Sequence, residues 1–291
     1  MRTRVSITVA KSAGFCPGVK SAIDKVLELS NKRKRRIYTL GPLIHNKQVI
    51  ETLEQNNIHA VKSASEIKEK GALLVIRAHG IPPKEERAIR SLGLEVIDAS
   101  CPLVKRVQEN IRAYAKKGYA TVIVGDKDHA EVVGLMGYTG GRGRVISGPE
   151  EADSLPRLKK VNIVAQTTQE GGIFTEAAEA VSRKAAELVV SNTICNPTKL
   201  RQSETVKFAK GSDLVIVVGG KNSANTARLF QICDRLAKRA VHIETESELE
   251  AGLFRGVKRI FITAGASTPT WLVEKALEKV RGLLGRPPRG S

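Results

Sequence analysis

Residues 94–105 read Leu-Glu-Val-Ile-Asp-Ala-Ser-Cys-Pro-Leu-Val-Lys, an apolar run that ends at Cys101 and is followed directly by Pro102. Proline suits the first turn of a helix, where its missing N–H group costs nothing. Apolar residues then recur at helical spacing, at positions 104, 107, 111, 114 and 115. The stretch therefore predicts a strand, a cysteine at its end and a helix behind the cysteine.

The same arrangement occurs twice more along the chain. An apolar run at residues 5–10 precedes Cys16 and its neighbour Pro17, and a second run at residues 188–194 precedes Cys195. Two further predicted strands follow each cysteine, and each of them ends in a polar loop. These loops contain, in chain order, His45, His79, His129, Thr167, Ser223 and Ser267. The near-constant spacing of these features indicates a threefold internal repeat.

Strands that alternate with helices predict parallel βαβ units, whose ligand-binding loops lie at the carboxyl ends of the strands. We therefore predict an α/β fold, a trefoil of three parallel-sheet units related by a pseudo-threefold axis around a central cluster. The predicted units are residues 15–99, residues 100–194, and residues 1–14 together with 195–281. Residues 282–291 are expected to form a disordered tail.

The four cysteines predict a metal centre. Because no secretion signal is found, metal ligands or core residues are expected in place of disulfides. Cys16, Cys101 and Cys195 occupy equivalent places beside predicted helix N-termini, which stabilise a thiolate. Their wide spacing does not fit the close cysteine pairs of a zinc site and fits a 4Fe–4S cluster with one iron not bound by protein. Cys233 has no counterpart in the repeat and lies on an apolar stripe, so we expect it in the core.

The polar loops predict a site for an anion. The candidate donors are the side chains of His45, His79, His129, Ser223, Asn225 and Ser267. His59 and His242 lie outside these loops and are not included. Glu131 is the only carboxylate in the loop cores, and among anion-binding groups a carboxyl is better interpreted as a proton relay. Thr167 and Thr168 could hold a hydroxyl group or pass a proton.

The composition restricts the possible partners. The formal net charge is +18, which favours an anionic ligand or partner, and the basic run at residues 32–36 is interpreted as a solvated turn. A basic RNA-binding protein with a structural metal is one alternative, but only 4% of the residues are aromatic and no recognition module is found. No apolar run approaches the roughly 20 residues that span a bilayer. We therefore expect no nucleic acid, no membrane and a cytoplasmic location.

At these residues the chain resembles the 4-hydroxy-3-methylbut-2-enyl diphosphate reductases, the last enzymes of the methylerythritol phosphate pathway to isoprenoids. The segments that carry the resemblance are residues 14–19, 41–46, 77–80, 98–104, 129–132, 166–168, 193–195, 221–225 and 265–269. They cover almost the whole chain in order. Two positions depart from the pattern of the family, which often has a serine where this chain has Ala224 and a proline where it has Ala130.

The resemblance implies an iron–sulfur oxidoreductase that removes the hydroxyl group of an allylic diphosphate to give isopentenyl and dimethylallyl diphosphate. It implies that the three repeated cysteines hold the 4Fe–4S cluster and that Glu131, Thr167 and His129 face the hydroxyl group. The diphosphate would be held by His45, His79, Ser223, Asn225 and Ser267, with Thr168 also binding substrate. Ferredoxin or flavodoxin would supply electrons. A dehydratase that uses such a cluster only as a Lewis acid, with no net reduction, is the nearest alternative.

Overall fold

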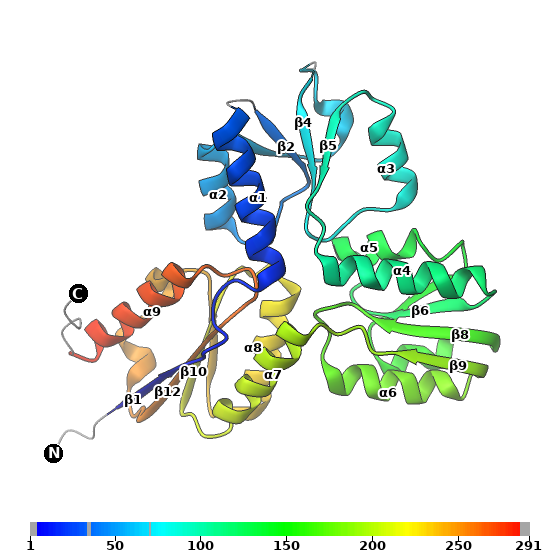
Figure 1. Cartoon of the computed structure of the whole chain (residues 1–291). Coiled ribbons are helices and arrows are strands. Elements are labelled where there is room, and N and C mark those ends of the chain that lie inside the picture. Colours follow the sequence, from blue (N-terminus) through cyan, green and yellow to red (C-terminus); the bar gives the residue numbers. More distant parts are fainter. Residues whose placement is uncertain (1–4, 34–35, 70, 286–291) are drawn as a thin grey trace. The chain divides into compact units, whose positions relative to one another are not determined.

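The computed structural model (Figure 1) describes residues 5–33, 36–69 and 71–285. By their contacts these residues form two compact units. The first unit comprises the chain up to Cys16, residues 45–47 and the chain from Asn196 onward. The second unit comprises residues 17–44 and 48–195. Residues 34 and 35 of the basic run, and residues 286–291 of the predicted tail, lie outside the described residues.

One four-stranded parallel sheet forms the centre of the first unit, in the order β1–β12–β10–β11. Its strands are β1 (Ser6–Val9), β10 (Leu214–Val218), β11 (Ala240–Ile243) and β12 (Arg259–Ala264). Its helices are α7 (Asn196–Ala209), α8 (Ala224–Leu236) and α9 (Thr270–Leu283), with short 3-10 turns η3 (Glu246–Glu248) and η4 (Ala251–Phe254). Every residue of β10 is buried because alternate side chains pack towards α9 on one face and towards α7 and α8 on the other.

The second unit contains two more parallel sheets. The first has the order β3–β2–β4–β5. Its strands are β2 (Ile37–Leu40), β3 (Ile58–Val61), β4 (Leu73–Ile76) and β5 (Glu95–Asp98). The helices of this part of the chain are α1 (Pro17–Arg33), α2 (Lys47–Gln55) and α3 (Pro83–Arg90), with a 3-10 turn η1 (Ala64–Glu66). All four residues of the central strand β4 are buried, as expected for a parallel strand covered on both faces.

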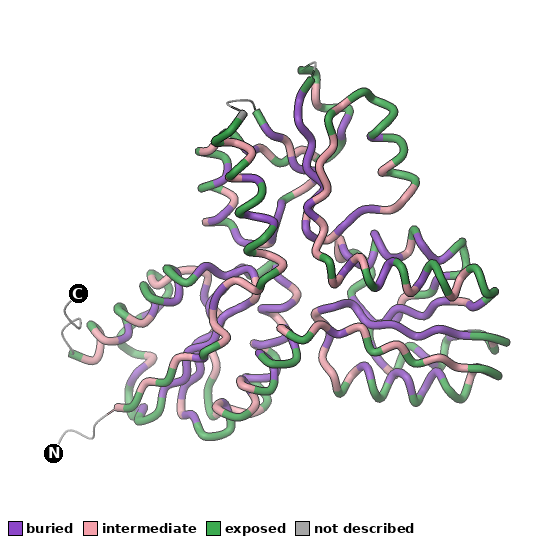
Figure 2. Tube along the Cα trace, viewed as in Figure 1, coloured by how far each residue is buried: buried purple, intermediate pink, exposed green. Residues whose placement is uncertain are grey.

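The other sheet of the second unit has the order β7–β6–β8–β9. Its strands are β6 (Ala120–Val124), β7 (Gly143–Ile146), β8 (Leu158–Ala165) and β9 (Ala185–Ser191). Its helices are α4 (Pro102–Lys116), α5 (Ala130–Met136) and α6 (Gly171–Ser182), with a 3-10 turn η2 (Pro149–Ser154). Val122 and Val124 pack with α6, whereas Ile123 between them packs with α4 and α5. Figure 2 shows the resulting pattern, in which buried residues run along the central strands and the helices alternate between buried and exposed positions.

The three sheets have the same strand order relative to the cysteines. The strand that leads to each cysteine is an edge strand, and it pairs with the strand that comes immediately before it in the cyclic order of the repeat: β5 with β4, β9 with β8, and β1 with β12. The predicted α/β class with three parallel sheets is confirmed. Each sheet lies within one of the three predicted ranges, although the boundaries of those ranges stay a prediction.

Two smaller sequence expectations concern the ends of the chain and its hydropathy. Residues 282 and 283, which we assigned to the tail, are the last residues of α9. Among the described residues, no helix is both long enough and apolar enough to cross a membrane.

Candidate functional site

Each repeated cysteine is anchored by its backbone in the same way. The N–H group of Cys16 donates to the carbonyl of Ala266 at 3.0 Å, that of Cys101 to Ala78 at 2.9 Å, and that of Cys195 to Thr167 at 3.0 Å. In every case the acceptor lies two residues beyond the end of the neighbouring strand, which is β12, β4 or β8. The repeat predicted from the sequence is therefore present at the level of single hydrogen bonds.

The side chains of these cysteines differ from that of Cys233. Cys16, Cys101 and Cys195 are half-buried and form no disulfide, and each lies at the start of a helix; Pro17 and Pro102 are the first residues of α1 and α4. Cys233 is completely buried in the core of the first unit, which raises the pKa of its thiol to about 12. The prediction that Cys233 is a core residue is confirmed.

Glu131 and Thr167 form a buried pair in the second unit. The Thr167 backbone N–H donates to Glu131 Oε1 and the Thr167 hydroxyl donates to Oε2, both at 2.7 Å. The two residues are 2% and 6% exposed, so water is largely kept from the carboxyl group. Because the Thr167 carbonyl also accepts the N–H of Cys195, Thr167 connects the carboxyl group of Glu131 to the backbone of a repeated cysteine.

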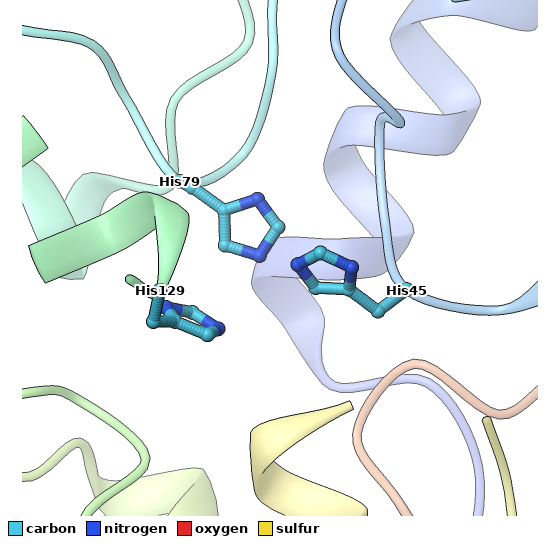
Figure 3. Close-up of side chains that lie close together, drawn as sticks. All are labelled: His45, His79 and His129. Carbon is cyan, nitrogen blue, oxygen red and sulfur yellow. The ribbon is translucent and has the colours of Figure 1, made fainter. Parts of the chain in front are cut away.

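His79 and His129 also lie together in the second unit. Their ring centroids are 5.3 Å apart and the rings meet edge to face (Figure 3). His129 is the N-cap of α5 and its Nδ1 accepts the N–H of Glu131 at 3.2 Å, which leaves Nε2 as the nitrogen that can donate. Gly137, the C-cap of α5, permits the close packing of α5 against the loop after His79, because a Cβ atom there would lie 2.6 Å from that of Pro82.

Gln166 is a residue of this site to which the sequence analysis assigned no role. It is fully buried, its Oε1 accepts the N–H of Asp126 at 2.9 Å, and its Nε2 donates to the Thr168 hydroxyl at 3.1 Å. The Thr168 oxygen thus accepts a hydrogen bond, and its own hydroxyl proton stays available to another acceptor. The sequence could have indicated a role for Gln166, because Gln166 follows an apolar strand directly and the other site residues also lie in loops after such strands.

Arg77 lies in the loop between β4 and His79 and is packed against Gly41. A Cβ atom at Gly41 would lie 2.5 Å from Arg77 Nη1, and Gly41 has a positive φ of 70°. The positive φ favours glycine at that position, whereas the contact with the end of the flexible Arg77 side chain could be relieved by a small shift. Burial lowers the pKa of Arg77, and the charge of Glu85 acts in the opposite direction. A guanidinium nevertheless stays charged at neutral pH, so the loop carries a positive charge.

The first unit brings together three of the predicted anion-binding loops. The Ser267 hydroxyl donates to the His45 carbonyl at 3.2 Å and to the Ser223 hydroxyl at 3.4 Å. Ser223 is the N-cap of α8, where its side chain accepts the N–H of Thr226. A Cβ atom at Gly220 would lie 2.6 Å from the His45 carbonyl oxygen, so the loop after β10 can approach this backbone only with glycine.

Asn225 lies in the first turn of α8 and is 5% exposed. Its Nδ2 atom is buried and has no hydrogen-bond partner among the described residues. An unsatisfied buried amide is costly, and a bound anion would remove that cost. The next residue, Thr226, is fully buried between two glycine loops: a Cβ atom at Gly265 would lie 2.0 Å from its hydroxyl oxygen, and one at Gly219 would lie 2.9 Å away. Thr226 was not identified from the sequence.

The predicted site residues are therefore divided between the units. The second unit contains Cys101, Cys195, His79, His129, Glu131, Thr167 and Thr168, and the first contains Cys16, His45, Ser223, Asn225 and Ser267. His59 and His242 lie within β3 and β11, outside these loops as expected.

Three parallel sheets, each with one repeated cysteine at a helix start and with polar loops at its strand ends, define the class as an α/β protein built from three repeated parallel-sheet units. Residues 7–281 match the family described as "LytB protein". The chain belongs to this family, which confirms the family membership expected from the sequence.

Relatives and solved structures agree with this assignment. The chain is 43% identical to the 4-hydroxy-3-methylbut-2-enyl diphosphate reductase of Aquifex aeolicus, over 95% of this chain and 96% of the relative. It is 42% identical to that of Citrifermentans bemidjiense, over 96% and 98%. A solved structure of the reductase described as the terminal enzyme of the non-mevalonate pathway is 43% identical, with a TM-score of 0.69 over 96% of this chain and 99% of that one. The Plasmodium falciparum reductase is 30% identical, with a TM-score of 0.90 over 98% and 89%.

Proposed function

We propose that this chain is a 4-hydroxy-3-methylbut-2-enyl diphosphate reductase. It takes up two electrons and two protons, expels the substrate hydroxyl group as water, and gives isopentenyl and dimethylallyl diphosphate, in the last step of the methylerythritol phosphate pathway. Family membership and relatives about 42% identical over nearly the whole chain support this reaction. The observation that carries the proposal is the buried Glu131–Thr167 pair, which is hydrogen-bonded to the backbone of Cys195.

Cys16, Cys101 and Cys195 would hold a 4Fe–4S cluster with one iron not bound by protein. Their half-buried thiols, their places at helix starts and the identical anchoring of their backbones fit three equivalent ligands of such a cluster. When bound, the cluster would supply electrons and a Lewis-acidic iron for the substrate oxygen.

The diphosphate would be held by side chains of the polar strand-end loops, namely His45, His79, Thr168, Ser223, Asn225 and Ser267. The Asn225 Nδ2 group has no hydrogen-bond partner among the described residues, and the Thr168 hydroxyl can still donate because its oxygen accepts from Gln166. Both groups can donate hydrogen bonds to phosphate oxygens. Ala224 offers no hydroxyl group, so the first turn of α8 would bind through Ser223 and Asn225 alone.

Glu131, Thr167 and His129 would act at the hydroxyl end of the substrate. Glu131 in its protonated form would supply a proton, and Thr167, whose hydroxyl contacts Glu131 Oε2, would pass it on by accepting from the carboxyl group while donating its own hydroxyl proton to the substrate oxygen. His129 would donate from Nε2, since its Nδ1 is engaged by the N–H of Glu131. The burial of the pair would keep bulk water from competing for that proton.

The remaining parts of the proposal concern partners. An acidic electron carrier such as ferredoxin or flavodoxin would donate electrons, and the net charge of +18 favours its approach. The expected cytoplasmic location and the expected lack of nucleic-acid binding stay predictions.

The proposal is tested with protein prepared and assayed without oxygen. We expect iron and acid-labile sulfide in the protein and two electrons consumed per molecule of product; product formed without electron consumption would favour the dehydratase. Cys101→Ser should lose the cluster and the activity, since it removes one of three thiolate ligands. Cys233→Ser is the matched control, and it should keep both because Cys233 lies in the core. The reverse result would refute the assignment of the ligands.

A further inference from the structure

A helix follows each repeated cysteine. One side chain of that helix contacts the residues that come just before another of the repeated cysteines. The contact is made by the residue nine positions after the cysteine, which is Lys25, Asn110 or Glu204. We call the residues just before each cysteine its lead-in segment: residues 11–15, 98–100 and 191–194. The first contact lies in the second unit, where Lys25 Nζ on α1 donates to the Asp98 carbonyl in the lead-in segment of Cys101 at 2.6 Å.

The second contact is part of a closed triangle of hydrogen bonds. Asn110 Nδ2 on α4 donates to the hydroxyl of Ser191, in the lead-in segment of Cys195, at 3.3 Å. That hydroxyl donates to Asn162 Oδ1, and Asn162 Nδ2 donates back to Asn110 Oδ1, both at 2.9 Å. Asn162 is completely buried in β8, so the triangle satisfies a side-chain amide that has no access to water.

The third contact, in the first unit, is the most extensive. Glu204 on α7 accepts the N–H of Lys11 at 2.8 Å and both the N–H and the hydroxyl of Ser12, at 3.0 and 2.5 Å. Burial by itself would raise the pKa of Glu204, but these bonds and the charge of Arg201 lower it below its ordinary value. Arg201, 3% exposed and one turn earlier, donates to the Gly14 carbonyl at 3.0 Å and to the Ala264 carbonyl at 2.7 Å.

Together the three contacts form a cycle. The helix after Cys16 holds the lead-in segment of Cys101, the helix after Cys101 holds that of Cys195, and the helix after Cys195 holds that of Cys16. The residue types differ, being a cation, an amide and an anion, while the position in the repeat is the same. A shared position filled by different chemistry indicates that the contact itself, and not one kind of side chain, is what the repeat requires.

We infer that Lys25, Asn110 and Glu204 are positioning residues for the cluster ligands, an inference that rests on the proposed function. Each repeated cysteine follows an edge strand, which has a ladder partner on one side only. Its backbone N–H is bonded to the neighbouring loop, and its lead-in segment is bonded to the helix of another cysteine. Groups that hold metal ligands in place typically change metal affinity about 10- to 100-fold when they are replaced. Glu204 should have the largest effect, because it alone accepts three hydrogen bonds.

The test replaces Glu204 by alanine, with Glu278→Ala as the matched control, since Glu278 is an exposed glutamate on α9 of the same unit. Visible absorbance follows the loss of iron to a chelator from protein prepared without oxygen. We expect Glu204→Ala to lose iron about 10- to 100-fold faster than the unchanged protein, and Glu278→Ala to match the latter. Equal rates for all three proteins would overturn the inference.

A second measurement does not depend on the cluster. In protein stripped of iron, amide hydrogen exchange at Lys11 and Ser12 should be faster in Glu204→Ala, because the acceptor of both amides is gone. If Glu204→Ala does not fold, Ser12→Ala removes only the hydroxyl bond and should speed iron loss by a smaller factor; an unchanged rate there would overturn the inference. Failure of the proposed function would look different, since the unchanged protein would then contain no iron or sulfide while the exchange result at Lys11 and Ser12 would remain.

Discussion

Replacing Glu131 by glutamine separates proton supply from substrate binding. Glutamine keeps the length of the side chain, and its single carbonyl oxygen can still accept the Thr167 N–H that now bonds to Oε1. Its amide group would face the Thr167 hydroxyl, which would change from donor to acceptor. Hydrogen bonds to a carboxylate contribute about 1.5–3 kcal/mol and neutral ones about 0.5–1.5 kcal/mol. The two weaker bonds should therefore lower the free energy of unfolding by about 2 kcal/mol. Part of this loss is offset because the variant no longer buries a charged carboxylate.

The variant should consequently fold, assemble its cluster and bind inorganic diphosphate normally. Turnover should fall by roughly 100- to 10,000-fold, which is the contribution of a positioned general acid. The assay is product formation from 4-hydroxy-3-methylbut-2-enyl diphosphate without oxygen, driven by a chemical reductant so that partner binding does not limit the rate. Glu176→Gln, at an exposed position on α6 of the same unit, is the control and should be fully active. Full activity of Glu131→Gln would refute the proton role, and loss of the cluster would show that Glu131 is structural.

Two further predictions concern anion binding and packing. His79→Asn should weaken binding of inorganic diphosphate in a calorimetric titration, because it removes a donor to phosphate oxygen, whereas His59→Asn should not; equal weakening would mean that the site has been misplaced. Gly137→Ala should lower the free energy of unfolding by about 1–3 kcal/mol, since its Cβ would lie 2.6 Å from that of Pro82. Gly172→Ala on α6, where a Cβ would meet nothing within 4 Å, should leave stability unchanged or raise it by up to about 1 kcal/mol in a denaturant titration.

The sequence predicted the local elements well, because local order is encoded locally. Apolar runs such as Leu214–Val218 predicted buried parallel strands, and all five residues of that strand are buried. Pro17 and Pro102 marked helix starts, and both are the first residues of their helices. The stripe around Cys233 predicted a core position, which the structure confirms.

The order of the strands within each sheet was beyond local patterns. The predicted ranges grouped residues 1–14 with residues 195–281, but no local pattern showed that β1 pairs with β12, about 250 residues away in sequence, or that β5 pairs with β4. Which edge a parallel strand joins depends on how the intervening helices cross the sheet, and no residue of the strand records it.

By itself the sequence determined the fold class, the three equivalent cysteines and the set of polar loops, because these follow from periodicity, repeat spacing and the chemistry of single side chains. Only the tertiary structure decided which of those side chains bond to one another. Thr167 joins Glu131 to Cys195, Gln166 orients Thr168, and Glu204 holds Ser12 through contacts between residues far apart in the chain. A hydrogen bond needs its two atoms within about 3 Å, and that precision is reached only when packed strands and helices have set the backbone of both partners.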